Sequence, residues 1–200
     1  MALITEPDFL EKIRSNKYRI MEFFGSSDSG MTLSLFLLLR RLNRISAYIS
    51  LASTNHDYRM LKDIVGKKTF IGIMDKPSME ELRNVIDHVA PYLNYLVIDD
   101  FAYYILHKKK SEIQDIMDFL TKIINKHDVK IIIVNQYRYK FDEDNNSELV
   151  RLYKNFLEPY IDLGVEVKRL DDNKENIKMN AIFQKTRVTL DSLIPKFLRE

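Results

Sequence analysis

The chain has 200 residues, enough for one domain with a sizeable hydrophobic core. Hydrophobic residues make up 46% and charged residues 30% of the sequence, a balance that is typical of globular proteins and excludes bulk disorder. The net charge of +2 is too small to indicate nucleic-acid binding by itself, so any DNA contact requires local basic clusters. The sequence has no cysteine, which excludes disulfides and thiolate metal sites.

The sequence gives no sign of membrane targeting. The first 14 residues include acidic side chains and lack the basic and then apolar layout of a signal peptide. The longest apolar stretch, 33–39, is interrupted by Ser34 and is far shorter than a membrane span. These features predict a soluble, cytoplasmic protein without a membrane partner.

Apolar runs and helical periodicities alternate along the first two thirds of the chain. Short apolar runs predict strands at 18–24, 46–51, 69–74, 95–98 and 130–134. Turn-spaced apolar residues predict helices at 32–43, 57–65 and 111–126. A further helix begins after Ser78, which forms a capping box with Glu81. Strands that are apolar throughout indicate an α/β fold, with helices covering both faces of a mostly parallel sheet.

The last third of the chain has a different pattern. Segments 165–170, 177–184 and 187–190 resemble strands connected as hairpins, and 171–176 form a polar turn between two of them. We therefore expect a C-terminal antiparallel extension at the edge of the sheet.

Residues 25–32 read Gly-Ser-Ser-Asp-Ser-Gly-Met-Thr and carry most of the pattern of a phosphate-binding loop. In the full pattern, backbone N–H groups cradle phosphates, a lysine reaches the β- and γ-phosphates, and a hydroxyl holds Mg²⁺. Both glycines, their spacing and Thr32 are present, whereas Met31 stands at the lysine position. The loop follows a predicted strand and precedes a predicted helix, as the motif requires. The alternative is a plain Gly/Ser turn.

Two further predicted strands end in polar residues. Strand 95–98 runs into Asp99 and Asp100, as does a Walker B strand, whose terminal carboxylate holds Mg²⁺ through water. Strand 130–134 runs into Asn135 and Gln136, at the sheet edge where open α/β sheets bind ligands. Amides at this edge can sense a γ-phosphate by hydrogen bonding. The alternative is that they begin a solvated turn.

These three elements together resemble the RecA recombinase family, over most of the chain. Arg19–Gly25 is similar to the family's strand before the loop, Asn135–Arg138 to its Asn-Gln-hydrophobic-Arg segment, and Phe183–Arg187 to its late basic strand. The resemblance implies a RecA-like core over 18–200, preceded by a short N-terminal segment, 1–17. It also implies ATP and Mg²⁺ as cofactors.

The resemblance further implies roles for the residues that match. Phosphates would be bound by Gly25, Ser29, Gly30 and Thr32. The metal would be held by Thr32 and Asp99, with Asp100 as the alternative carboxylate. Gln136 would sense the nucleotide and couple it to the DNA-binding loop that follows. Two cations, Lys185 and Arg187, would reach the ATP of a neighbouring subunit.

The departures from the family bear on catalysis. Met31 removes the lysine of the loop, and Ala52 stands where the family has a glutamate that orients the attacking water. Each such group supplies several kcal/mol of transition-state stabilisation. The sequence therefore predicts a degenerate ATPase with weak or absent hydrolysis.

Two predicted loops, 103–111 and 137–148, would face DNA in a RecA-like protein. The first holds Lys108, Lys109 and Lys110 beside aromatic residues, which suits backbone neutralisation and base stacking. A solvated run before a helix is an equally good interpretation of these lysines. The second loop begins with Arg138 and Lys140 and then turns acidic at 142–144, where carboxylates would repel phosphates.

Two classes of function follow. The first is a RecA-like DNA recombination or repair protein that binds single-stranded DNA and ATP. Such a protein would act through self-association, or beside an active recombinase or another replication or repair protein. The second is a non-catalytic RecA-like scaffold or loader that acts through protein partners. A regulator that binds nucleotide without turnover is a variant of these.

Overall fold

The computed structural model describes residues 6–26, 29–52, 63–141, 147–169, 177–183 and 186–190, with side chains described over 9–26, 29–52, 63–137 and 151–167. In chain order its elements are α1 (Glu6–Arg14), β1 (Ile20–Gly25), α2 (Met31–Leu42), β2 (Ser46–Ser50), β3 (Thr69–Ile73), α4 (Met79–Val89), η1 (Ala90–Tyr92), β4 (Tyr95–Asp99), α5 (Phe101–Ile105), α6 (Lys110–His127), β5 (Lys130–Phe141), β6 (Ser147–Arg151), α7 (Lys154–Leu157), η2 (Glu158–Tyr160), β7 (Leu163–Arg169), β8 (Ile177–Phe183) and β9 (Thr186–Leu190).

The described strands form one sheet in the order β3-β2-β4-β5-β1-β7-β8-β9, with β6 paired to β5. All pairings from β3 to β7 are parallel, whereas β8 pairs antiparallel with β7 and β9 with β8. The predicted α/β fold with a mostly parallel sheet is confirmed. The backbone pairing of β8 and β9 matches the predicted antiparallel extension.

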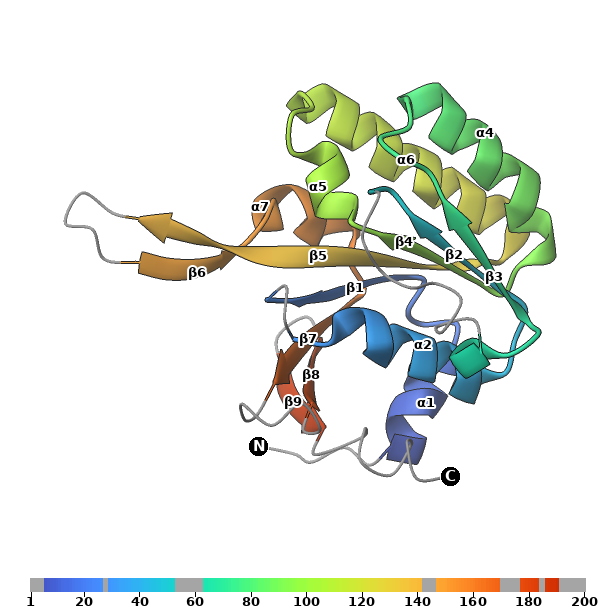
Figure 1. Cartoon of the computed structure of the whole chain (residues 1–200), viewed down its shortest axis with the longest axis horizontal. Helices are drawn as coiled ribbons and strands as arrows, with labels where there is room; N and C mark the ends of the chain where they lie inside the picture. The colour runs from blue at the N-terminus through green and yellow to red at the C-terminus, as the bar shows by residue number, and fades with distance from the viewer. Residues whose placement is uncertain are drawn as a thin grey trace.

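Helices cover both faces of the sheet, and each face has its own hydrophobic core (Figure 1). On one face, α1 and α2 pack on the sheet, and Phe36 of α2 lies against Tyr48 of β2 with ring centroids 4.6 Å apart. On the other face, α4 to α7 cover the sheet and bury the apolar side of the long helix α6. Burial on both faces explains why the central strands are apolar throughout.

Several local features match the sequence closely. Ser78 forms the predicted capping box at the start of α4, because its hydroxyl accepts from Glu81 N at 3.1 Å and the Glu81 carboxylate accepts from Ser78 N at 2.7 Å. Helices α2 and α6 lie within one residue of their predicted bounds. Among the helices of the described residues, none is long and apolar enough to cross a bilayer.

The N-terminal helix α1 is tied to the core by a buried lysine. Phe9 and Ile13 of α1 are almost fully buried in the same core as α2. Lys130, at the start of β5, donates from Nζ to the carbonyl oxygens of Ile13 (2.8 Å), Arg14 and Ser15 (2.7 Å). These are carbonyls that the last turn of a helix leaves without intrahelical partners. Helix α1 is therefore an integral part of one face of the molecule.

The prediction of a loop at 137–148 is wrong for residues 137–141, which form a strand. Residues 137–141 continue β5 and pair antiparallel with β6, from Tyr137 opposite Arg151 to Phe141 opposite Ser147. The hairpin projects well beyond the rest of the sheet (Figure 1). The alternation of aromatic and basic residues at 137–141 has the period of a strand, a signal that the interpretation as a loop overlooked. The acidic residues 142–144 and the predicted turn 171–176 lie outside the described residues.

The first predicted DNA loop is shorter than 103–111. Residues 103–105 belong to α5 and residues 110 and 111 to α6, which leaves only 106–109 as the connection. Of the predicted helix 57–65, only 63–65 are described, and these are helical.

Candidate functional site

The carboxyl ends of β1 and β4 lie at the same edge of the sheet as Asn135 and Gln136 of β5, because these strands are parallel and adjacent in the order β4-β5-β1. Gly25, the last residue of β1, pairs with Gln136 of β5 and with Val167 of β7. Asp99, the last residue of β4, pairs with Ser50 of β2. Since neighbouring strands lie about 4.8 Å apart, β4 and β1 are separated by about 10 Å. The topology thus brings the phosphate loop, the carboxylates and Gln136 to one edge.

Gly25 occupies a position that admits no side chain. A Cβ atom built on it would lie 2.4 Å from the Val167 carbonyl oxygen and 2.7 Å from Ser29 Oγ. Gly30 adopts a left-handed conformation, with φ of 81°, as N-cap of α2. Glycine is therefore required at both positions of the predicted phosphate loop, at Gly25 by lack of space and at Gly30 by the backbone conformation. A plain turn would not require glycine at both.

Ser29 lies inside the loop as a buried polar group. The residue is fully buried, and its hydroxyl makes no hydrogen bond with any of the described residues. Its backbone N–H donates to Ser26 O at 3.1 Å. Thr32 follows in the first turn of α2 and is half-buried. A buried hydroxyl without a partner, beside the amino end of a twelve-residue helix, fits an anionic ligand such as phosphate.

Met31, which stands at the lysine position of the motif, packs its side chain into the hydrophobic core. The side chain is 5% exposed and belongs to the hydrophobic core formed by α1, α2 and the sheet. Position 31 is therefore used for packing. A methionine at this position places no charge in the core.

Asp99, which ends β4, and Asp100, which follows it, form a buried carboxylate pair. Asp99 is 4% exposed and accepts from the Tyr48 hydroxyl and, at 2.7 Å, from Asp100 N. Asp100 adopts a left-handed conformation, with φ of 58°, as N-cap of α5. Such a conformation is uncommon for a residue other than glycine, and it recurs at functional sites. Tyr48, which the sequence did not single out, is a further residue of this site.

Asp100 has a strongly perturbed pKa. Burial, and secondarily the adjacent Asp99 carboxylate, raise the pKa of Asp100 to about 7, while a hydrogen bond from Ser50 acts in the opposite direction. Gln136 Nε2 lies 3.5 Å from Asp100 Oδ1. The structure therefore brings the candidate sensor Gln136 to the carboxylate pair. A cation at this edge would favour the ionised form of both carboxylates.

Asn135 does not begin a solvated turn. It is fully buried, and its Nδ2 donates to Glu22 Oε1 at 2.6 Å and to Leu152 O at 2.7 Å. Its Oδ1 accepts from Gln136 N at 2.7 Å. The amide of Asn135 thus joins β1, β5 and the residue that follows β6, and it orients the backbone at Gln136.

A buried ion pair lies at the base of the hairpin. Glu22 of β1 is fully buried, and its Oε2 lies 3.3 Å from a guanidinium nitrogen of Arg151. Burial raises the pKa of Glu22, and the charge of Arg151 opposes that rise. The guanidinium of Arg151 also stacks over Phe24, 4.9 Å from the ring centroid. Sequence reasoning missed this pair, although a glutamate inside an apolar strand was a visible signal.

The predicted DNA-binding residues fall in two neighbouring segments. Lys108 lies over the ring of Tyr104 at 4.5 Å, and Lys110 over the ring of Phe156 at 5.4 Å. Lys109 is exposed as N-cap of α6, where its N–H donates to the Glu112 carboxylate at 2.9 Å. The backbones of Arg138 and Lys140 lie in the β5–β6 hairpin.

The two predicted trans-acting cations are not brought to this edge by any described contact. Lys185 lies outside the described residues, and Arg187 is described only by its backbone in β9, paired with Ile182. Strand β9 is the outermost described strand on that side of the sheet.

No protein-family model and no curated protein matches the sequence. Solved structures do match it. The crystal structure of the RadB recombinase superposes with a TM-score of 0.59 at 14% identity, covering 88% of this chain and 84% of that chain. A second solved structure, an ATPase domain, superposes with a TM-score of 0.63 at 12% identity, covering 96% of this chain and 89% of that chain. At such identities the comparison shows the fold, which is that of a RecA-like P-loop core.

Proposed function

We propose that the protein is a RecA-like, nucleotide-binding protein of DNA recombination or replication that binds single-stranded DNA and hydrolyses ATP weakly or not at all. The observation that carries the proposal is the phosphate loop. Its Ser29 hydroxyl is buried and has no hydrogen-bond partner among the described residues, and its glycines form a cradle. The lysine position of the motif is occupied by Met31, which packs into the core. The loop therefore retains the means to bind phosphate and lacks the charge that drives its transfer.

Different residues at this edge would bind the phosphates and the Mg²⁺ of Mg-ATP. Backbone N–H groups of the loop and of the first turn of α2, together with Ser29, Gly25 and Gly30, would hold the phosphates. The Thr32 hydroxyl and the Asp99–Asp100 pair would hold Mg²⁺, which supplies charge neutralisation between the phosphates when bound. Tyr48 fixes the orientation of Asp99 through its hydrogen bond.

Gln136 is the proposed link between nucleotide and DNA. Its side chain lies at Asp100, and its carbonyl oxygen accepts from Leu152 N at 3.2 Å, immediately after β6. A ligand that draws Gln136 or Asp100 toward itself would therefore act on both strands of the hairpin at its base. The next residue, Tyr153, donates from its hydroxyl to Leu106 O at 2.7 Å, in the segment before Lys108. This chain of contacts supports a coupling between the edge of the sheet and both candidate DNA segments.

The test is fluorescence anisotropy of a labelled single-stranded oligonucleotide, measured with and without Mg-ATP at several salt concentrations. We expect binding that weakens as salt rises, because phosphate contacts release counterions, and that tightens with Mg-ATP. Replacement of Lys108, Lys109 and Lys110 by alanine should weaken binding and reduce the salt slope. The matched control replaces the exposed Lys67, Lys68 and Lys76 near β3 and should change neither quantity.

Outcomes separate the alternatives. Binding that is indifferent to ATP would leave a DNA-binding protein without nucleotide coupling. Absence of binding at moderate salt would overturn the DNA proposal and favour the scaffold or loader that acts through protein partners.

A further inference from the structure

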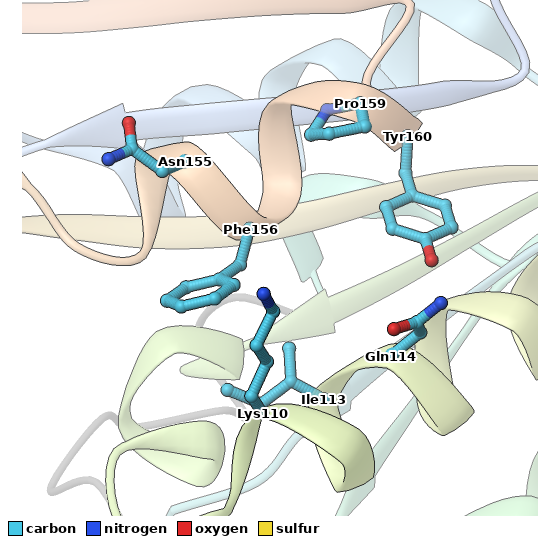
Figure 2. A pocket seen from close by; sticks show the side chains of 7 residues that line it. All are labelled: Lys110, Ile113, Gln114, Asn155, Phe156, Pro159 and Tyr160. Atoms are coloured by element: carbon cyan, nitrogen blue, oxygen red, sulfur yellow. The ribbon is translucent and has the colours of Figure 1, made fainter.

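A hollow of about 420 Å³ lies between the first turns of α6 and the α7–η2 segment, on the face of the sheet that α4 to α7 cover. Figure 2 shows its lining, which comprises Lys110, Ile113, Gln114, Asn155, Phe156, Pro159 and Tyr160. Its volume falls in the range of sites that hold small organic groups. None of these residues except Lys110 takes part in the nucleotide or DNA sites described above.

The hollow, called the slot below, has an aromatic ring at each end. The rings of Phe156 and Tyr160 point from α7 and η2 toward α6, at opposite ends of the hollow, with Ile113 on the α6 side (Figure 2). Phe156 is 37% exposed, so part of its ring is accessible to a ligand. The Tyr160 hydroxyl donates to Asp118 Oδ1 at 3.0 Å, and this bond fixes the orientation of its ring.

Gln114 lies on the α6 side of the slot near Tyr160, whereas the Asn155 amide points outward from the α7 side (Figure 2). The side-chain amides of Gln114 and Asn155 are exposed and make no hydrogen bond with other described residues. Each offers a donor and an acceptor, which is what the edge of a nucleobase requires. The ammonium of Lys110 lies 5.4 Å from the Phe156 centroid, at the mouth of the slot, and Lys109 and Lys108 precede it.

We propose that this slot receives one unpaired base of a single-stranded nucleic acid. The base stacks on Phe156, its edge hydrogen-bonds to the Gln114 amide, and the adjoining phosphate lies beside the Lys110 ammonium. Aromatic stacking with an adjacent cation is how single strands are bound without strong sequence preference. This inference rests on the proposed binding of single-stranded DNA and adds the group that is bound and the residues that bind it.

The test compares an ordinary oligonucleotide with one whose sugars carry no bases, using Phe156→Leu, Gln114→Ala and wild type in anisotropy titrations. For wild type we expect the abasic strand to bind about tenfold more weakly, the effect of losing one stacked base. Phe156→Leu should weaken binding of the ordinary strand by a similar factor and leave the abasic strand unaffected. The matched control is Phe70→Leu, the same substitution at a 63% exposed phenylalanine on β3, which should behave as wild type.

Gln114→Ala removes only an exposed amide, so its effect does not depend on the fold, and we expect a smaller loss that is also confined to the ordinary strand. If the ratio of affinities for the ordinary and the abasic strand is the same in wild type and in both slot variants, the slot does not bind a base. The proposed DNA binding would remain intact. Failure of wild type to bind any strand would overturn both. If a free mononucleotide displaces the labelled strand as effectively as an unlabelled strand does, the slot is a site for free nucleotides. That result would overturn the assignment to a strand.

Discussion

At the scale of single residues, we propose that methionine in place of lysine at position 31 separates phosphate binding from phosphoryl transfer. The loop keeps the features that depend on backbone geometry, namely the cradle at Gly25 and the left-handed Gly30. It has Met31 in place of the lysine that reaches the β- and γ-phosphates in the full motif. Phosphate binding through backbone N–H groups would need no particular side chain at position 31.

Restoring hydrolysis should require two substitutions. Met31→Lys alone returns the cation but leaves Ala52 without a group that orients water, so phosphate release should stay near the wild-type level. It should also lower the melting temperature, because it introduces an ammonium at a position that is 5% exposed in an apolar core. Met31→Lys combined with Ala52→Glu should raise phosphate release well above either single variant. The control, Met31→Leu, should keep wild-type nucleotide binding. Brisk hydrolysis in Met31→Lys alone would contradict the role assigned to position 52.

Asp100 should make stability depend on pH. Its pKa is about 7 in the folded protein against an ordinary value of 3.8. Between about pH 4 and 7 the folded state therefore binds more protons than the unfolded chain, and the free energy of unfolding falls as pH rises. The slope from this one group is at most about 1.4 kcal/mol per pH unit.

Urea unfolding of Asp100→Asn across this pH range should show a flatter dependence than wild type. Asp87→Asn is the matched control, because Asp87 lies on the surface in an exposed ion pair with Lys126. Identical slopes in wild type and Asp100→Asn would show that Asp100 titrates normally.

At the scale of elements, the end of helix α1 is held to the sheet by hydrogen bonds from Lys130. Lys130→Met keeps the stem of the side chain and removes three hydrogen bonds to the end of α1. Leaving buried carbonyls unpaired costs about 1–3 kcal/mol, which corresponds to a fall in melting temperature of about 2–4 °C per kcal/mol for a chain of this size.

Lys126→Met is the control for Lys130→Met. It removes a lysine whose partner, Asp87, lies 3.5 Å away on the surface, and exposed pairs contribute less than about 1 kcal/mol. Melting temperatures followed by circular dichroism should therefore differ between the two variants. Equal temperatures would mean that α1 is held by Phe9 and Ile13 alone.

The β5–β6 hairpin should be separable from the fold. Joining Arg138 to Val150 through Asn-Gly removes residues 139–149 and closes a pair that is already in register. Because Tyr137 and Arg151 remain, the contacts at the hairpin base are kept, and the melting temperature should change little. Affinity for single-stranded DNA should fall, since the variant loses Lys140 and the projecting ribbon. Undiminished affinity would restrict DNA binding to the α5–α6 segment and the slot beside it.

The elements that the sequence predicted accurately are those whose apolar pattern is set by burial alone. Apolar strands and periodic helices are set by burial on both faces, so α2, β4, α6 and the core of β5 were predicted within a residue or two. The continuation of β5 into the hairpin was missed, because its pairing with β6 replaces burial as the cause of strand structure there. Local polarity at 137–141 resembles that of a loop.

The sequence identified the motif residues of the candidate site, but it did not identify all of their contacts. Gly25, Gly30 and the Asp99–Asp100 pair follow from motifs that are local in sequence. The partners Tyr48 and Arg151 come from other strands, and only the register of the sheet brings them to Asp99 and Glu22. Identifying such pairs needs tertiary structure, because a buried charge in a strand predicts that a partner exists without saying which.

At the scale of the whole molecule, two hydrophobic cores hold a parallel sheet whose carboxyl edge carries the phosphate loop, the carboxylates and Gln136. Hydrogen bonds through Asn135, Leu152 and Tyr153 connect that edge to the hairpin and to the lysine segment before α6. In the proposed function, the nucleotide at this edge would act through these hydrogen bonds as a ligand that adjusts DNA binding.

The measurement that tests this account most directly is calorimetric titration of Mg-ATP into the protein, with phosphate release followed in the same samples. The account predicts saturable binding, lost when Gly25→Ala places a Cβ against Val167 O and Ser29, together with phosphate release at or near background. Absence of binding at millimolar Mg-ATP, or turnover as fast as that of an ordinary ATPase, would contradict it.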